Sequence, residues 1–406
     1  MTKHLFQFPL VDSSYDNEEI LRCIETLLSG QLTMGPRVKA FEEAFSALLG
    51  AEHAVMVNSG SSANLLAMSA LTNPQRSNRL HTGDSVAVPA VCWSTSLWPI
   101  IQMGLRPVLV DVDPETLNLS IPDFERAISE RGIKAIMMVH TLGNSTELGE
   151  FLDLVERHGL FLIEDTCESL GSTIDEKYLG TIGDFGTFSF YFSHHMTTIE
   201  GGMVLAKTTE DVDLLRALRS HGWSREQSRR SEMELENPDI DPRFLFVNIG
   251  YNLRPMEIQA AFGLEQLSRL STMNESRREN VKRIRNAFIE HPDWQGQMDF
   301  PRAGRGVDPC WFGFPFLLAD SSVDHRRFTN ALMERGVDTR PIVSGNMALQ
   351  PALKHFDIDL SLGPFEGAQT IHDRGLFIGC HASPLGDHTI ELLVNAVLEA
   401  YDRAAT

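Results

Sequence analysis

The stretch LFLIEDTCES, residues 160–169, indicates the fold of this chain most directly. Its apolar run ends in Glu164 and Asp165, and Glu168 follows three residues later. An apolar run without strict alternation is typical of a strand buried on both faces, as in a parallel sheet covered by helices. Acidic side chains at the end of such a strand lie where open α/β sheets bind their ligands. The stretch therefore predicts a parallel sheet and a site at its edge.

Comparable apolar runs precede and follow this stretch, separated by helical or loop segments. They cover residues 54–57, 85–89, 107–112, 134–140, 186–191 and 203–206. This alternation predicts an α/β fold with a mostly parallel central sheet. A helix is expected before the first strand, because PRVKAFEEAFSALLG ends at Gly50 and has apolar residues at helical spacing, namely Val38, Phe41, Phe45 and Leu48.

The second half of the chain has a different pattern. The polar segment 225–243 predicts a long loop, and the helix formers of residues 255–291 predict a long helix or a helix pair. A smaller C-terminal α/β unit is expected to follow, with strands at 311–318 and 375–380. We therefore expect a large domain over 1–254, a linking helical segment over 255–291, and a small domain over 292–406.

Composition narrows the possible partners. The 406 residues include 35 basic and 55 acidic side chains, giving a formal charge of −20 that repels nucleic acid and anionic membranes. Residues 1–19 lack the apolar core of a signal peptide, so a cytoplasmic protein is expected. An odd number of widely spaced cysteines fits neither a disulfide framework nor a metal site, which predicts reduced thiols at Cys23, Cys92, Cys167, Cys310 and Cys380.

Two segments carry candidate ligand contacts, and each has a simpler alternative. NSGSSANLLAM, residues 58–68, offers backbone N–H groups and hydroxyls to a phosphate, although a strand-to-helix turn with a serine N-cap would look the same. Asp165 could pair with a protonated pyridine nitrogen, or it could cap the next helix. The sequence alone leaves both alternatives open.

Two further segments contain histidines and arginines. TFSFYFSHHMTTIEGGMV, residues 187–204, has adjacent histidines that could be metal ligands, buried core groups or a general base; neighbours on an extended strand point apart, which disfavours one shared metal. SHGWSR (220–225) and GYNLRP (250–255) offer side chains that suit a carboxylate or phosphate, or that are simply solvated. These side chains are His221, Arg225, Asn252 and Arg254.

Taken in order, these segments resemble the DegT/StrS family of nucleotide-sugar aminotransferases and dehydratases over nearly the whole chain. The family contains pyridoxal-phosphate (PLP) enzymes of fold type I, the aspartate aminotransferase-like fold. Its motif SF(x)3K(x)5EGG carries the lysine that binds the cofactor, and SFYFSHHMTTIEGG has His194 in that position. This departure resembles the sugar 3-dehydratase branch, in which a histidine acts as the catalytic base.

One member of this branch holds an iron–sulfur cluster with four cysteines between the HGW and GYN segments. This chain has no cysteine there, so the resemblance implies no iron–sulfur cluster and no metal. It also implies a homodimer. The segment RPIVSGN (340–346) is expected to border the sugar site. The implied cofactor contacts are Gly60, Ser61 and Ser189 at the phosphate, Asn252 reaching it from a partner subunit, Trp93 stacked on the ring, Asp165 at its nitrogen and Glu168 near its hydroxyl. His221, Arg225 and Arg254 are expected to bind the carboxylates of the amino donor.

The resemblance implies a dehydration. Glutamate would convert PLP to its pyridoxamine form (PMP) and leave as 2-oxoglutarate. The amine would join the 4-keto group of a nucleotide-linked 4-keto-6-deoxy sugar, with a GDP-linked mannose derivative as the expected substrate. His194, with a pKa expected near neutrality, would remove a proton so that the C3 hydroxyl leaves, giving ammonia and a 4-keto-3,6-dideoxy sugar. The alternatives are another keto sugar or antibiotic precursor, a catalytically inactive PLP-binding protein, and ordinary amino transfer.

Overall fold

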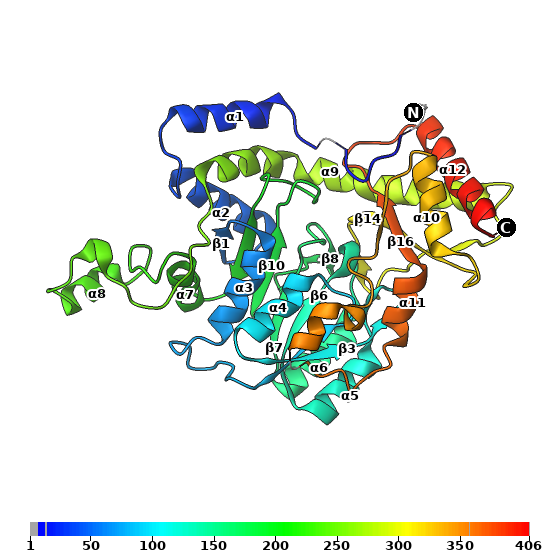
Figure 1. Ribbon diagram of the computed structural model, residues 1–406. Helices are drawn as coiled ribbons and strands as arrows, with labels where there is room; N and C mark the ends of the chain where they lie inside the picture. Colours follow the sequence, from blue (N-terminus) through cyan, green and yellow to red (C-terminus); the bar gives the residue numbers. More distant parts are fainter. Residues whose placement is uncertain (1–6, 13, 357, 406) are drawn as a thin grey trace.

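The computed structural model describes residues 7–12, 14–356 and 358–405 (Figure 1). Its central feature is a seven-stranded sheet in the order β1-β11-β10-β7-β6-β2-β3. Only β11 runs antiparallel to its neighbours, and the other neighbouring strands are parallel, which confirms the mostly parallel sheet. The strands are β1 (His53–Val57), β2 (Ser85–Pro89), β3 (Arg106–Val110), β6 (Ile133–Val139), β7 (Phe161–Asp165), β10 (Phe185–Ser189) and β11 (Gly202–Ala206).

Helices lie between these strands, as the alternation of runs predicted. They are α2 (Pro36–Leu49), α3 (Gly60–Leu71), α4 (Ser94–Gln102), α5 (Ile121–Arg131), α6 (Leu148–His158) and α7 (Thr209–Arg219). In α2 one of the four apolar residues at helical spacing, Leu48, is not buried: it is 41% exposed, while Leu49 is 5% exposed. A step of four residues from Phe45 stays on the buried face of this helix, whereas a step of three turns outward.

The segment 225–243 is not a continuous loop. It contains α8 (Arg230–Glu236) and a 3-10 turn, η2 (Pro242–Phe244), which corrects the prediction. Helix α8 buries none of its described residues, so apolar periodicity could not reveal it. Ion pairs on its surface support it instead, including Arg230–Glu234 at 2.7 Å with the favourable spacing of four residues. Figure 1 shows α8 projecting from the body of the molecule.

The predicted long helix is one element, α9 (Glu257–Glu290), of 34 residues. It packs against α1 (Asn17–Leu28), α2 and α12 (Asp387–Ala405), and so joins the two ends of the molecule (Figure 1). Among the described residues no helix is both long enough and apolar enough to cross a membrane. Residues 1–6 and 13, which belong to the N-terminal stretch searched for a signal peptide, lie outside the described residues.

The C-terminal unit has a four-stranded antiparallel sheet in the order β12-β14-β16-β15. The two strands predicted there are confirmed as neighbours, because β14 (Gly313–Leu318) pairs directly with β16 (Gly375–Gly379). Phe8 is buried and bridges to Val337, so the first described residues lie beside this unit. The domain boundaries at 254 and 291 stay a prediction.

The remaining elements of the described chain are β12 (Met298–Asp299), β15 (Thr339–Pro341), α10 (His325–Glu334), α11 (Glu366–Arg374), β4 (Val112–Asp113), β5 (Asn118–Leu119), β8 (Thr173–Ile174), β9 (Lys177–Tyr178), β13 (Val307–Asp308), η1 (Thr141–Gly143), η3 (Met347–Leu349) and η4 (Pro351–His355).

Candidate active site

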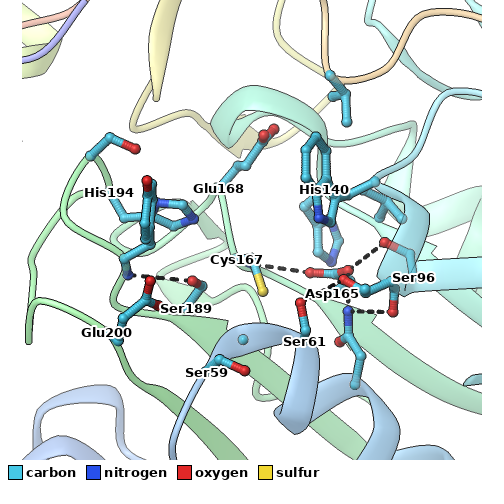
Figure 2. A pocket seen from close by; sticks show the side chains of 18 residues that line it. Ser59, Ser61, Ser96, His140, Asp165, Cys167, Glu168, Ser189, His194 and Glu200 are labelled. Atoms are coloured by element: carbon cyan, nitrogen blue, oxygen red, sulfur yellow. Dashed lines mark hydrogen bonds between the residues drawn. The ribbon is translucent and has the colours of Figure 1, made fainter.

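A pocket of about 360 Å³ lies where β6 and β7 end and α3 begins (Figure 2). This is the edge at which open parallel sheets bind ligands. The pocket brings together seven of the predicted site residues from four separate segments. They are Gly60, Ser61, Trp93, Asp165, Glu168, Ser189 and His194.

The start of α3 forms the floor of the pocket. Ser59 caps the helix by accepting a hydrogen bond from the backbone N–H of Ser62 at 3.1 Å, so the N-cap alternative is also correct. A side chain at Gly60 would come within 2.4 Å of the Ser189 Cβ, so only glycine lets Ser189 lie against the helix start. The first turn carries no acidic residue. An anion can therefore approach the free N–H groups and the hydroxyls of Ser61 and Ser189.

Asp165 ends β7 and presents its carboxylate to the pocket. Its Oδ2 accepts hydrogen bonds from Asn64 Nδ2 and Ser96 Oγ, both at 2.7 Å. Its Oδ1 accepts only the backbone N–H of Cys167, at 3.2 Å, among the described residues. No helix follows directly, so the helix-cap alternative is wrong. Oδ1 thus keeps a lone pair for a cationic donor in the pocket.

Glu164, one residue earlier, faces away into the protein and has a structural role. Its carboxylate accepts the backbone N–H groups of Gly180, Ile182 and Gly183 at 2.7–2.9 Å, and His140 Nε2 lies 3.1 Å away. Burial raises the pKa of Glu164, but these hydrogen bonds outweigh it and leave the pKa below its ordinary value. Alternation along β7 thus separates a structural carboxylate from a functional one.

Glu168 lies across the pocket from Asp165. Burial raises its pKa to about 7, against the lowering effect of a hydrogen bond from the Leu142 N–H, and the charge of Asp165 adds to the rise. Near neutral pH its carboxyl therefore exchanges between the protonated and ionised forms. Such a group can either donate a hydrogen bond to a ligand oxygen or accept one from it.

The two adjacent histidines have different surroundings. His195 is 1% exposed, and its Nε2 lies 2.9 Å from the carbonyl oxygen of Cys310, which makes it a buried core residue, although its Nδ1 also has no hydrogen-bond partner among the described residues. His194 lines the pocket, and its ring packs edge-on against Tyr191 and Phe312, with centroids 5.9 and 5.2 Å away. Within the described chain no group of three potential ligand side chains could hold a metal ion.

The protonation of His194 differs from the expectation of a pKa near neutrality. Burial, and secondarily the positive charge of Arg277, lower its pKa to about 3. The imidazole is therefore neutral at pH 7 and can accept a proton. Its Nδ1 is buried without a hydrogen-bond partner in the described structure. Leaving a buried nitrogen without a partner costs free energy. Such unpartnered groups are often found at sites that act on a ligand.

The four remaining predicted residues do not reach the pocket within this chain. They form one group, which we call the Trp223 cluster: His221, Arg225 and Arg254 lie around the ring of Trp223, and Asn252 contacts Arg254. The guanidinium of Arg225 lies 3.9 Å from the centroid of that ring, and the guanidinium of Arg254 lies 5.6 Å from it. Arg254 Nε also donates to Asn252 Oδ1 at 2.9 Å.

Several pocket residues escaped the sequence analysis, notably Asn64, Ser96 and His140. His140 directly follows β6, the parallel neighbour of β7, and parallel neighbours end at the same edge, so this signal was available. Asn64 lies one helical turn beyond Gly60, on a helix that was expected to contribute only its first residues. Val343 also lines the pocket, so the segment 340–346 does reach it.

The pocket fits pyridoxal phosphate. The helix start with Ser61 and Ser189 suits its phosphate, and the crowding that a side chain at Gly60 would cause shows that this approach is specifically kept open. Asp165 suits a protonated pyridine nitrogen, and Trp93, which is 57% exposed, offers a ring face. Among the described lining residues there is no lysine, and His194 stands in the position that the family motif gives to one.

Fold and site together define a vitamin B6 enzyme of fold type I. The comparisons with known proteins then specify the family: a model of the DegT/DnrJ/EryC1/StrS aminotransferase family matches residues 13–398, and the chain belongs to this family. The family predicted from the sequence is thereby confirmed.

Several individual members of the family are similar to this chain over most of their length. The GDP-4-keto-6-deoxy-D-mannose 3-dehydratase of Yersinia pseudotuberculosis is 37% identical over 392 residues, covering 95% of this chain and 97% of that protein. The dTDP-4-dehydro-2,6-dideoxy-D-glucose 3-dehydratase of Saccharopolyspora spinosa is 34% identical, covering 95% and 84%. A crystal structure of GDP-4-keto-6-deoxymannose-3-dehydratase with a trapped PLP-glutamate geminal diamine superposes with a TM-score of 0.88 at 36% identity, covering 96% and 100%.

Proposed function

We propose that this protein is a PLP/PMP-dependent 3-dehydratase of a nucleotide-linked 4-keto-6-deoxyhexose. GDP-4-keto-6-deoxymannose is the substrate and L-glutamate the amino donor. The products are a 4-keto-3,6-dideoxy sugar, 2-oxoglutarate and ammonia, so the sugar loses one oxygen overall. One observation carries the proposal: a histidine, His194, faces the cofactor pocket in place of the lysine of the family motif.

Each pocket residue then has a part in holding the cofactor. The start of α3, with Gly60, Ser61 and Ser189, binds the phosphate, and Trp93 stacks on the ring. Asp165, whose Oδ1 accepts one backbone N–H, would pair with the protonated ring nitrogen. When bound, the cofactor supplies an amino group for the keto carbon and a ring that accepts an electron pair.

His194 moves the proton that starts the elimination. Being neutral at pH 7, its imidazole would accept a proton from the carbon that bears the amine, and Asp165 would keep the ring nitrogen protonated so that the ring can accept the electron pair. The C3 hydroxyl then departs with a proton as water. Tyr191 and Phe312 pack edge-on against the imidazole and hold its ring at the pocket. An imidazole does not form a lasting bond to the cofactor aldehyde, so the lysine-dependent release used in amino transfer is closed.

A homodimer completes this site. His221, Arg225 and Arg254 would bind the carboxylates of glutamate, and Asn252 would reach the phosphate, in the pocket of the second copy. Two features support a second copy: the Trp223 cluster lies outside its own pocket, and α1 exposes its apolar side chains. These are Ile20, Leu21, Ile24, Leu27 and Leu28. An apolar surface of this kind is typical of an interface.

The proposal is tested by incubating the protein with PLP, glutamate and, in turn, a GDP-, CDP- or dTDP-linked 4-keto-6-deoxy sugar. The products are then analysed by mass spectrometry. We expect the GDP-linked sugar to lose one oxygen while ammonia and 2-oxoglutarate accumulate. Nitrogen retained on the sugar would instead indicate amino transfer. Failure of all three sugars would refute the proposed substrate class.

A second candidate substrate has an observation in its favour. The Saccharopolyspora relative is named for a dTDP-linked sugar, so the same pocket chemistry exists in the family with another nucleotide. The catalytically inactive alternative is distinguished by a spectrum, since an enzyme converts added PLP and glutamate to the pyridoxamine form. An unchanged spectrum with no 2-oxoglutarate would support the inactive protein.

A further inference from the structure

Asn64 lies on α3, one helical turn beyond the phosphate-binding residues, and is 2% exposed. Its Nδ2 donates to Asp165 Oδ2 at 2.7 Å and to the carbonyl oxygen of Thr95 at 3.2 Å. Its Oδ1 accepts from Thr187 Oγ1 at 2.5 Å. Every polar atom of this side chain is therefore committed to one arrangement.

Chemistry fixes the orientation of the Asn64 amide. Both Asp165 Oδ2 and the Thr95 carbonyl are acceptors, so the NH2 group must face them. The amide oxygen must then face Thr187, whose hydroxyl has a proton to give. A flipped amide would set its oxygen against a carboxylate oxygen, which costs both hydrogen bonds and adds repulsion.

This arrangement determines which oxygen of Asp165 faces the cofactor. Asn64 and Ser96 together occupy Oδ2, which leaves Oδ1 with a single backbone donor (Figure 2). Asn64 also sits on the helix whose first turn forms the phosphate cradle. One rigid helix therefore links the two ends of the cofactor site, with Gly60 and Ser61 at one end and the Asp165 carboxylate at the other.

We propose that Asn64 is a positioning residue, which holds Asp165 at the cofactor nitrogen and fixes its distance from the phosphate site. The inference rests on the proposed function, because it assigns the ring nitrogen to Asp165. Asn64 does not touch the reacting atoms and acts through Asp165. Its effect should therefore appear in the binding and spectrum of the cofactor as well as in turnover.

The test measures PLP affinity by absorbance titration of the cofactor-free protein. We expect Asn64→Leu, which has a similar size but no polar atom, to weaken PLP binding about tenfold, as loss of a hydrogen bond to a charged group predicts. We also expect the absorbance of bound PLP to titrate at lower pH, because the ring nitrogen loses a firmly held partner. Thr187→Val removes the hydroxyl that holds the Asn64 amide. It should change the PLP affinity and the pH at which bound PLP titrates in the same directions as Asn64→Leu, but by smaller amounts.

Asn73 provides a matched control just beyond the C-terminal end of the same helix. It is 3% exposed and pairs its amide with that of Asn248, with both hydrogen bonds at 3.2 Å. Asn73→Leu should lower thermal stability but leave PLP affinity and spectrum unchanged. The proposal is overturned if Asn64→Leu or, should that variant not fold, Thr187→Val binds PLP with wild-type affinity and spectrum. If the wild type itself binds no PLP, the proposed function fails instead.

Discussion

The pocket and the Trp223 cluster differ in how complete they are within one chain. In the pocket the polar side chains are held by a network: Asp165 accepts three hydrogen bonds, and Asn64 uses both ends of its amide. In the Trp223 cluster the arginines stack on an indole whose own Nε1 is buried without a partner among the described residues. The side chains of the cluster are ordered by contacts with one another, but within the described chain they have no anionic partner at the pocket.

This difference suggests a division of labour. In the proposed mechanism, the residues that would hold the cofactor and move the proton lie at the end of the parallel sheet, where the backbone fixes them. The residues proposed for the amino donor's carboxylates lie on the segments 220–225 and 250–255, which precede and follow α8 in the chain and would meet a second copy under that proposal. Disturbing the pocket should therefore destroy chemistry, whereas disturbing the cluster should weaken donor binding.

The largest effect is expected at Asp165. Asp165→Asn keeps the size of the side chain but removes the negative charge that would hold the cofactor's ring nitrogen protonated, so the ring would accept an electron pair less readily. We expect kcat/KM to fall about 10²–10³-fold, comparable to the loss of a transition-state hydrogen bond. Steady-state assays with the GDP-linked sugar measure it. A fall in kcat/KM of less than about threefold would show that Asp165 has no important role in the mechanism.

Mixing two inactive variants tests whether the cluster serves the second copy. His194→Ala damages the pocket, and the double variant Arg225→Ala with Arg254→Ala damages the cluster. Random mixing of subunits should restore about one quarter of wild-type activity, because half of the dimers are mixed and each mixed dimer has one intact site.

The control for this mixture uses two pocket variants. His194→Ala with Asp165→Asn should restore nothing, because each chain then carries a damaged pocket. Activity that stays at background in the first mixture, although the subunits exchange, would mean that the cluster does not act across an interface.

A smaller effect is expected for Arg225 alone. Arg225→Ala removes one planar donor of the cluster, so we expect the KM for glutamate to rise about tenfold while kcat changes little. Kinetics with glutamate as the varied substrate measure it. A fall in kcat at unchanged KM would contradict a role for Arg225 in donor binding and would indicate a role in the chemical step.

The smallest effect concerns the stability of the cofactor-free pocket. Folded Glu168 keeps a proton up to a pKa of about 7, whereas an unfolded glutamate loses its proton near a pKa of about 4.3. The folded state therefore binds more protons between these values, and this carboxyl makes stability fall as the pH rises through that window. Glu168→Gln should remove this fall, which is worth about 1–3 kcal/mol between about pH 5 and pH 8. Urea unfolding at the two pH values measures it, and equal slopes for variant and wild type would contradict it.

Much of this molecule could be predicted from its sequence because the signals are local. The strand ending in Asp165 has an apolar run, and His194 lies in a motif of fixed spacing, so both were predicted without knowledge of distant contacts. Helix α8 was missed because it buries nothing and so carries no apolar period. The low pKa of His194 was missed because it depends on burial in the folded pocket and, secondarily, on the charge of Arg277, which comes from α9, a distant part of the chain.

The separation of His221, Arg225 and Arg254 from the pocket was not predicted, although the resemblance implied that Asn252 reaches the phosphate from a partner subunit. Which chain a loop serves depends on how two copies meet, and no residue pattern within one chain encodes that directly. The Asn64 network was missed for a related reason. It joins α3, β7 and β10, and only the register of the folded sheet brings Thr187 and Asp165 to the same amide.

The central claim is that His194 moves a proton and does not anchor the cofactor. His194→Lys tests it most directly, with the sugar product analysed by mass after a single turnover. The account predicts that formation of the 3,6-dideoxy sugar falls by about 10²–10⁴-fold, the contribution of a positioned general base. Dehydration at the wild-type rate in this variant would contradict it.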